Sequence, residues 1–267
     1  MTQTVHRAFT LIELLVVITI IVVLLALLAP ALDQAVYQAE LAACGARLKA
    51  VGSGFTLYAM DHARRYPHRP RTQAPAVGDS QHWIRATTPE NKPDDLRARV
   101  ARHISVNKML QCPFTKGADL EGAASTSQVF SSYQLWAGWQ FTFNGQVQPA
   151  MIRLGDQLGF EADRFDVLAS DVLANEPAAA QVAHPDFEGG TVNRPYQDEL
   201  VAPYFYTFSL WLGRAGTIDR QFAYSDGSVR KFQNVQFEAD AEGTMVYLPW
   251  RANSAQFPQK GTYLPKR

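Results

Sequence analysis

The sequence predicts an α+β protein in which a long N-terminal helix packs against an antiparallel β-sheet head. Three observations lead to this class. An apolar run extends from Phe9 to Ala29, a helical stripe of apolar residues lies between Tyr37 and Tyr58, and hairpin signatures follow Cys112. The expected segments are a leader at 1–8, a membrane-spanning helix at 9–30, an amphipathic spine helix at 31–65 and a globular α+β head at 66–267.

Charge and composition exclude a general nucleic-acid role. The 267 residues include 25 Lys plus Arg and 25 Asp plus Glu, so no net field attracts a polyanion. One basic cluster, between Arg64 and Arg71, lies among prolines. It has no interleaved series of aromatic residues that would form a stacking platform for bases, so we interpret it as a solvated loop and predict no nucleic-acid partner.

The N-terminal apolar run has the length of a membrane span. From Phe9 to Ala29 the only formal charge is Glu13. At about 1.5 Å per helical residue, this run matches a hydrocarbon core of roughly 30 Å. His6 and Arg7 precede it, which favours a cytoplasmic N-terminus and a head on the outer side of an inner membrane.

Two simpler interpretations of this run leave Glu13 unexplained. A cleaved secretory signal finds small residues at Ala29-Pro30-Ala31, but the run is longer than the usual signal core and starts with an acid. An uncleaved anchor would carry Glu13 as a cost of a few kcal/mol. Both interpretations remain alternatives. They would make the chain a secreted or membrane-anchored binding protein or hydrolase that does not polymerise.

A third interpretation gives Glu13 a partner. If a peptidase cuts between Ala8 and Phe9, the new amino group of Phe9 lies one helical turn from Glu13. Each charge then offsets the desolvation of the other, within one chain or between neighbouring helices. A buried charge pair of this kind would fix the register of an assembly.

The residues from Ala8 to Val17, AFTLIELLVV, resemble the prepilin cleavage and methylation motif of type IV pilins and type II secretion pseudopilins. The resemblance implies that a prepilin peptidase cuts before Phe9 and methylates it, that Glu13 is the assembly residue, and that Pro30 is the proline frequent in this family. The family has Gly before the cut where this chain has Ala8. Alanine is the next smallest residue, so we expect processing at a lower rate.

Helical periodicity resumes after Pro30, which is expected to kink the helix. The stripe predicts a face that docks onto the head. It consists of Tyr37, Leu41, Cys44, Leu48, Val51, Phe55 and Tyr58. Gly52 and Gly54 weaken the helix and indicate close approach of another backbone. The helix is expected to end before Tyr66-Pro67, because a residue before proline disfavours the α region.

The chain has two cysteines, Cys44 and Cys112, and neither lies in a C-x-x-C pair. Two buried thiols and one disulfide are both consistent with the sequence. The stretch 39–67 and Cys112-Pro113 resemble pseudopilin-type proteins abundant in planctomycetes. That resemblance implies a disulfide between Cys44 and Cys112, which would tie the spine to the head and contribute about 3–4 kcal/mol.

In the head, a short helix is predicted after the cap signal Thr88-Pro89-Glu90, including Leu96, Val100 and His103. Asn144-Gly145 and Asp226-Gly227 each lie between alternating runs and predict hairpins. For Asp226-Gly227 we predict a type I′ turn. Further strands are predicted at 165–169, 204–212 and 244–250.

No catalytic motif is present: the sequence lacks G-x-S-x-G, a P-loop, H-E-x-x-H and G-x-G-x-x-G. We therefore predict no enzyme activity, no cofactor and no metal. Asp171 and Asp226 are candidate calcium ligands, and His184-Pro185-Asp186 is a candidate start of a metal or acid–base site, but structural roles are favoured for all of them. Four tryptophans are expected to pack in the core rather than to form a carbohydrate-binding platform. They are Trp136, Trp139, Trp211 and Trp250.

The sequence as a whole predicts a structural subunit that assembles through its N-terminal helix into a type IV pilus or a type II secretion pseudopilus. The resemblance implies as partners a prepilin peptidase, other pilin-like subunits, an inner-membrane assembly platform with its ATPase, and the lipid bilayer. The expected location is the inner membrane, with a single pass, before assembly into a surface filament.

Overall fold

The structure, a computed structural model, describes only part of the chain. The described residues are 10–68, 83–87, 93–114, 129–140, 142–143, 146–148, 150–160, 162–171, 173–176, 179–182, 186–188, 191–193, 206–209, 217–236, 245–249 and 261–265.

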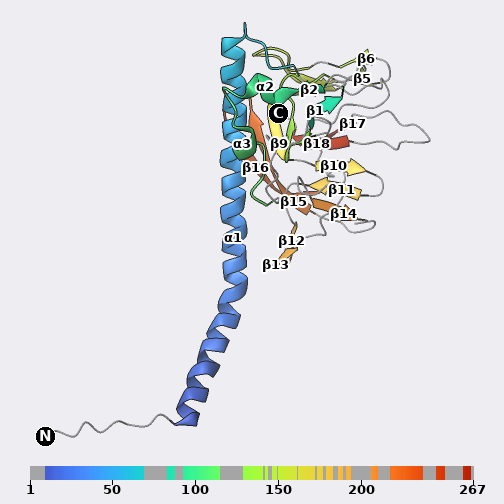
Figure 1. Ribbon diagram of the computed structural model, residues 1–267. Helices are drawn as coiled ribbons and strands as arrows, with labels where there is room; N and C mark the ends of the chain where they lie inside the picture. The colour runs from blue at the N-terminus through green and yellow to red at the C-terminus, as the bar shows by residue number, and fades with distance from the viewer. Residues whose placement is uncertain are drawn as a thin grey trace, which may run out of the picture.

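Helix α1, Leu11–Asp61, is one continuous helix of 51 residues. Its N-terminal part projects away from the head, and only its C-terminal part lies against it (Figure 1). Pro30 lies inside the helix, and Figure 1 shows α1 changing direction between its projecting and docked parts. Proline lacks the N–H for one helical hydrogen bond, which accounts for a bend at such a residue.

The helix ends close to the predicted position. Asp61 is its last residue, and Ala63 and Arg64 then adopt left-handed backbone angles, with φ of 52° and 63°. The amide of Arg64 donates to the carbonyl of Ala59 at 2.8 Å, which satisfies one of the last helical carbonyls. The chain then pairs with the segment near Ile152, whose carbonyl accepts from the amide of Tyr66 at 2.9 Å.

The docked part of α1 packs on a four-stranded sheet with the order β16-β15-β9-β4. All three pairings in this sheet are antiparallel. The bounds are β4 Tyr133–Leu135, β9 Val167–Asp171, β15 Thr217–Tyr224 and β16 Val229–Gln236. The predicted α+β class, a long helix on an antiparallel sheet, is therefore confirmed.

A second, five-stranded sheet has the order β14-β11-β10-β18-β17 and is also antiparallel. Figure 1 places this sheet on the side of the head away from α1. Its strands are β10 Leu173–Glu176, β11 Ala179–Val182, β14 Tyr206–Ser209, β17 Met245–Pro249 and β18 Gly261–Pro265. Strands β14 and β17 lie within two of the predicted segments.

Smaller elements complete the described part of the head. A three-stranded sheet has the order β2-β1-β3, and three two-stranded ribbons pair β5 with β6, β7 with β8 and β12 with β13. These strands are β1 Trp83–Thr87, β2 Pro93–Asp95, β3 Val129–Phe130, β5 Thr142–Phe143, β6 Gln146–Val147, β7 Leu158–Phe160, β8 Asp163–Phe165, β12 Asp186–Glu188 and β13 Thr191–Asn193. The short helices are α2 Leu96–Val100 and α3 Val106–Met109.

Both predicted hairpins are present, but one turn differs from its prediction. Strands β5 and β6 pair on either side of Asn144-Gly145, which lies outside the described residues. Between β15 and β16 only Gly227 has positive φ, 82°. A type I′ turn needs positive φ at Asp226 as well, so that prediction is wrong. The amide of Gly227 donates to the carbonyl of Tyr224, as in a type I turn followed by a left-handed glycine.

The predicted short helix also starts later than expected. Helix α2 begins at Leu96, and the Asp95 side chain accepts a hydrogen bond from the amide of Arg97 at 2.9 Å. Asp95 is therefore the N-cap, and it is also the last residue of β2. The predicted cap signal at Thr88-Pro89-Glu90 lies outside the described residues.

Trp136 and Trp139 are in the core, as predicted. Their exposed fractions are 0% and 1%, and their rings meet edge-on with centroids 5.4 Å apart. The indole Nε1 of Trp136 donates to Ser170 Oγ at 3.1 Å. Trp211 and Trp250 lie outside the described residues. The described pair therefore stabilises the head, because buried aromatic pairs contribute packing beyond the area they bury.

Candidate functional site: the N-terminal helix and its docking layer

The helix starts with a reciprocal capping box formed by Thr10 and Glu13. The Thr10 hydroxyl accepts from the amide of Glu13 at 3.2 Å. In return, Glu13 Oε2 accepts from the amide and from the hydroxyl of Thr10, both at 2.8 Å. The box satisfies backbone donors that a helix start otherwise leaves unpaired.

This role of Glu13 was missed from the sequence, although its signature is visible there. Thr10-Leu11-Ile12-Glu13 is a T-x-x-E pattern ahead of an apolar run, the pattern of a capping box. Ala8 and Phe9, between which cleavage is predicted, lie outside the described residues. The pairing of Glu13 with a terminal amine therefore stays a prediction, alongside the observed cap.

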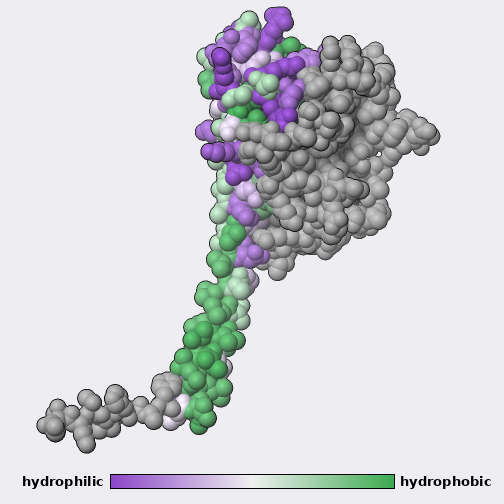
Figure 2. Space-filling view, viewed as in Figure 1, coloured by the Kyte–Doolittle hydropathy of each residue, from purple (hydrophilic) through white to green (hydrophobic). Residues whose placement is uncertain are grey.

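The projecting part of α1 is apolar and uncovered. Fifteen large apolar side chains between Leu11 and Leu28 are exposed, and Figure 2 shows them as a continuous hydrophobic surface. The hydroxyl of Thr19 donates to the carbonyl of Leu15 at 2.7 Å, so this polar group is satisfied within the helix. The helix is long and apolar enough to span a membrane.

The docked part of α1 buries the predicted stripe. Its members from Tyr37 to Phe55 are at most 2% exposed, and Tyr58 is partly buried against the same core. Apolar contacts are joined by polar ones at both edges of the stripe. The hydroxyl of Tyr37 donates to Asp219 Oδ2 at 3.3 Å, and Arg47 Nη1 donates to the carbonyl of Gln111 at 2.8 Å.

A buried polar layer lies in the middle of this contact, between α1 and the four-stranded sheet. Cys44 Sγ lies 3.1 Å from the Tyr133 hydroxyl and donates to Asp171 Oδ1 at 3.4 Å. Asp171 Oδ2 accepts from the main-chain amide of Gln221 at 2.7 Å. The side chain of Gln221 donates to the carbonyl of Leu41, inside α1, at 2.6 Å. We call Cys44, Tyr133, Asp171 and Gln221 the docking layer.

Burial sets the protonation of the Tyr133 hydroxyl in the docking layer. Desolvation raises the pKa of Tyr133 well above its ordinary value, and nearby Cys44, Cys112 and Asp171 raise it further. The hydroxyl therefore stays protonated and can donate to the carbonyl of Gln111 at 3.4 Å or to the sulfur of Cys44. Hydrogen bonding of each buried group makes the layer specific to one helix position.

Cys44 and Cys112 are both buried, and neither forms a disulfide in the structure. Cys44 contacts the Tyr133 hydroxyl, and Cys112 is close enough to raise the pKa of that tyrosine. Sequence reasoning placed them near one another through the resemblance, and the structure does bring both to Tyr133. A bond between them is absent here and stays a prediction.

Glycines let other parts of the head approach α1. A side chain at Gly45 would collide with Gln221 Oε1. A Cβ at Gly54 would lie 2.9 Å from the main-chain oxygen of His103. At Gly52 the nearest atom would be the Cβ of Ala223, at 3.4 Å. The close approach of another backbone is therefore confirmed at Gly54, whereas Gly52 has only side-chain atoms at ordinary contact distance and Gly45 makes room for a side chain.

The other sequence candidates have structural roles where the structure describes them. Asp171 belongs to the docking layer, and Asp226 Oδ1 accepts from the amide of Ser228 at 2.8 Å within the hairpin turn. His184 and Pro185 lie outside the described residues. Arg64, Arg65 and His68 are exposed, as expected for a solvated loop. Among the described residues, no three His, Cys, Asp or Glu side chains are grouped so as to hold a metal ion.

Comparison with known proteins supports the N-terminal assignment. Residues 4–29 match a family model described as the prokaryotic N-terminal methylation motif. No curated protein and no solved structure matches the chain. The matched motif is of the prepilin type, and the long helix packed on an antiparallel sheet has a pilin-like architecture, so both features are consistent with a pilin-like protein. The narrower resemblance of residues 39–67 stays a prediction.

Proposed function

We propose that this chain is a structural subunit that a prepilin peptidase processes and that then assembles, through α1, into a type IV pilus or a type II secretion pseudopilus. The proposal rests on one observation, that α1 is divided into two parts with different surroundings. One part bears the methylation motif and an uncovered apolar surface, and the other part is fixed to the head by the docking layer.

The uncovered surface requires an apolar environment. Burying a large apolar side chain contributes about 1.5–3 kcal/mol, so fifteen of them represent on the order of 20 kcal/mol or more. A lipid bilayer supplies that environment before assembly, and the helices of neighbouring subunits supply it afterwards. In this proposal the head has a structural role and no catalytic one, and the assembly partners are other pilin-like subunits.

The same proposal includes an orientation and further partners. The N-terminus lies in the cytoplasm and the head lies on the outer side of the inner membrane until assembly moves the subunit into a filament. An inner-membrane platform and its ATPase supply the work of extraction. The basic residues ahead of the span, His6 and Arg7, support this orientation.

Processing can be tested by the intact mass of the chain purified from its native membrane or filament. We expect a mature chain that begins at a methylated Phe9. A chain that begins at Leu32 would instead identify a cleaved secretory signal and would overturn the proposal. If the chain in wild-type filaments retains residues 1–8, processing by a prepilin peptidase is no longer part of the proposal.

Assembly can be tested by separating the charge of Glu13 from its capping role. Glu13→Gln keeps a side chain that completes a capping box but removes the charge, whereas Thr10→Ala removes the cap and keeps the charge. We expect Glu13→Gln to insert in the membrane and form no filaments, and Thr10→Ala to form them. Electron microscopy of wild-type and variant cells gives the readout. Normal filaments from Glu13→Gln, or a wild-type chain that never polymerises, would contradict the proposal.

A further inference from the structure

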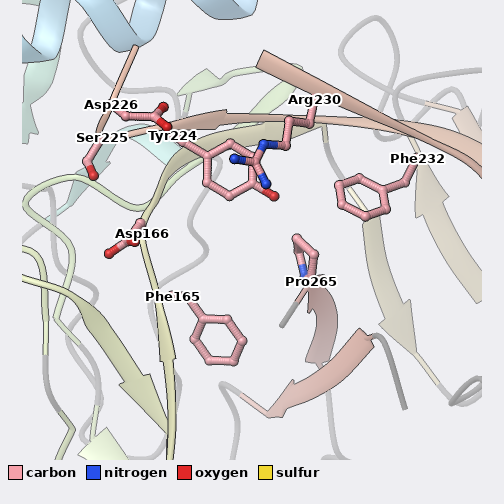
Figure 3. A pocket seen from close by; sticks show the side chains of 8 residues that line it. All are labelled: Phe165, Asp166, Tyr224, Ser225, Asp226, Arg230, Phe232 and Pro265. Atoms are coloured by element: carbon pink, nitrogen blue, oxygen red, sulfur yellow. The ribbon is translucent and has the colours of Figure 1, made fainter. Parts of the chain in front are cut away.

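A small cavity lies in the head where the β15–β16 turn meets the junction of β8 with β9 and the end of β18. Its volume is about 80 Å³. It is lined by Phe165, Asp166, Tyr224, Ser225, Asp226, Arg230, Phe232 and Pro265. Figure 3 shows the Arg230 guanidinium over the Tyr224 ring, with Phe165, Phe232 and Pro265 around the space beside them. The cavity therefore has a polar end and an apolar surround.

The two carboxylates of this cavity accept hydrogen bonds from the chain itself. Asp166 Oδ1 accepts from Gln157 Nε2 at 2.6 Å. Asp226 Oδ1 accepts from the amide of Ser228 at 2.8 Å, as the first residue of a turn commonly does. Both acceptors thus have a role in holding the loops that form the cavity.

The two strongest hydrogen-bond donors of the cavity, the Arg230 guanidinium and the Tyr224 hydroxyl, do not hold a loop in place. The guanidinium carbon of Arg230 lies 4.8 Å from the centroid of the Tyr224 ring, a cation–π contact. Among the described residues, neither the Arg230 guanidinium nor the Tyr224 hydroxyl forms a hydrogen bond or an ion pair. A tyrosine hydroxyl with its ordinary pKa of about 10 is protonated at neutral pH, and burial raises the pKa of Tyr224 further.

We propose that this cavity binds a carboxylate group carried on a short apolar stem. Arg230 and Tyr224 donate to the carboxylate, since charge-assisted bonds from guanidinium to carboxylate are among the strongest that a side chain offers. Phe165, Phe232 and Pro265 pack against the stem. A volume of about 80 Å³ is roughly that of three water molecules in the liquid, which admits a carboxylate with one or two methylene groups.

The charges of Asp166 and Asp226 oppose an anion, which gives the proposal a sharp test. Asp226 is exposed, so its repulsion is that of a pair in water, about 1 kcal/mol at 4 Å. Asp226→Asn keeps an acceptor for the turn and removes that charge. This change strengthens the binding of a carboxylate by up to about fivefold and weakens the binding of an ammonium ion.

The experiment uses the full chain in detergent micelles, labelled with [15N]arginine. The Arg230 Nε–Hε resonance is assigned by its loss in Arg230→Gln. Propionate, propionamide and n-propylammonium are titrated against the labelled chain, and calorimetry gives the dissociation constants for the variants. The matched control is Lys231→Gln, which removes the same charge from the next, exposed residue of β16.

We expect a saturable shift of the Arg230 resonance with propionate. Arg230→Gln raises the dissociation constant roughly tenfold, Tyr224→Phe raises it less, and Lys231→Gln leaves it unchanged. No saturable binding overturns the proposal, as does equal binding of propionamide or tighter binding of n-propylammonium. Two further ligands distinguish the source of the carboxylate: N-acetylglutamate diamide presents an acidic side chain, and an N-acetylated dipeptide presents a chain terminus. Tighter binding of either than of propionate identifies a protein ligand, and tighter binding of propionate identifies a small organic acid.

Discussion

The side-chain amide of Gln221 donates a 2.6 Å hydrogen bond to the main-chain carbonyl of Leu41, 180 positions away in the sequence. The bond joins β15 to the middle of α1, at a place where Gly45 leaves room for the Gln221 side chain. It ties both the height and the rotation of the helix to the sheet, because it joins the side chain of one strand residue to the carbonyl of one helix residue.

Gln221→Met tests the contribution of this bond. Methionine keeps much of the volume but removes the donor, so the free energy of unfolding should fall by about 1 kcal/mol. The main-chain amide of residue 221, which donates to Asp171, is retained. Denaturant unfolding in micelles, followed by tryptophan fluorescence, measures the loss. An unchanged midpoint would show that the bond contributes nothing to docking.

Gly52 and Gly54 lie on the same helix and are predicted to respond to alanine with opposite signs. At Gly54 the new Cβ would lie 2.9 Å from a main-chain oxygen and would press on Ile104, so Gly54→Ala should destabilise the protein by about 1–3 kcal/mol. At Gly52 the nearest atom would be at an ordinary contact distance of 3.4 Å. Gly52→Ala should therefore stabilise it by up to about 1 kcal/mol through helix propensity. Thermal unfolding of the pair gives the comparison, and equal shifts would contradict the close approach at Gly54.

Tyr66 is expected to make stability depend on alkaline pH. Burial, followed by the negative charge of Asp156, raises the pKa of Tyr66 to about 12 from an ordinary value of about 10. Between these pH values the folded chain holds a proton that the unfolded chain releases. The free energy of unfolding therefore falls as pH rises from about 10 to about 12, by at most about 2.7 kcal/mol.

Tyr66→Phe should remove that alkaline loss. At neutral pH it should cost little or stabilise the protein, because the Tyr66 hydroxyl is buried with no hydrogen-bond partner among the described residues. Urea denaturation at pH 8 and pH 11 measures both effects. A variant that loses as much stability as the wild type between these values would show that other groups cause the dependence.

The cysteines give a prediction about accessibility. Cys44 and Cys112 are 0% and 1% exposed and are not joined by a disulfide in the structure. The native chain should therefore resist a thiol-alkylating reagent, and the unfolded chain should take up two adducts. Mass spectrometry without prior reduction counts them. No adducts in the unfolded chain would instead establish the disulfide that the resemblance implies, and adducts in the native chain would contradict the burial.

Local sequence patterns predicted much of this fold. The stripe from Tyr37 to Phe55 recurs at helical spacing, and a face of that kind is buried wherever the helix has a partner. The two hairpins follow from Asn-Gly and Asp-Gly between alternating runs. Each of these signals lies within one short stretch of the sequence, so it can be identified without knowledge of the rest of the chain.

The docking layer could not be predicted in the same way. Asp171 and Gln221 are separated from Cys44 by more than a hundred positions, and each has a local explanation as an ordinary strand residue. The partners become visible only when β9 and β15 are paired, and sheet order is not encoded in any short pattern. The capping box at the start of α1 could have been predicted, because Thr10 and Glu13 form a local T-x-x-E pattern. The charge of Glu13 was instead assigned to assembly alone.

The separation between α1 and its partners also sets the order of events during synthesis. The strands that cover the Tyr37–Phe55 stripe include β15 and β16, which end at Gln236. At about 5–20 residues per second, ribosomes need roughly ten to thirty-five seconds to extend the chain from Asp61 to Gln236. Throughout this interval the helix presents its apolar stripe without the sheet that later protects it. The nascent chain is thus most exposed to aggregation before its last third exists, and its folding should depend on whatever shields that stripe in the meantime.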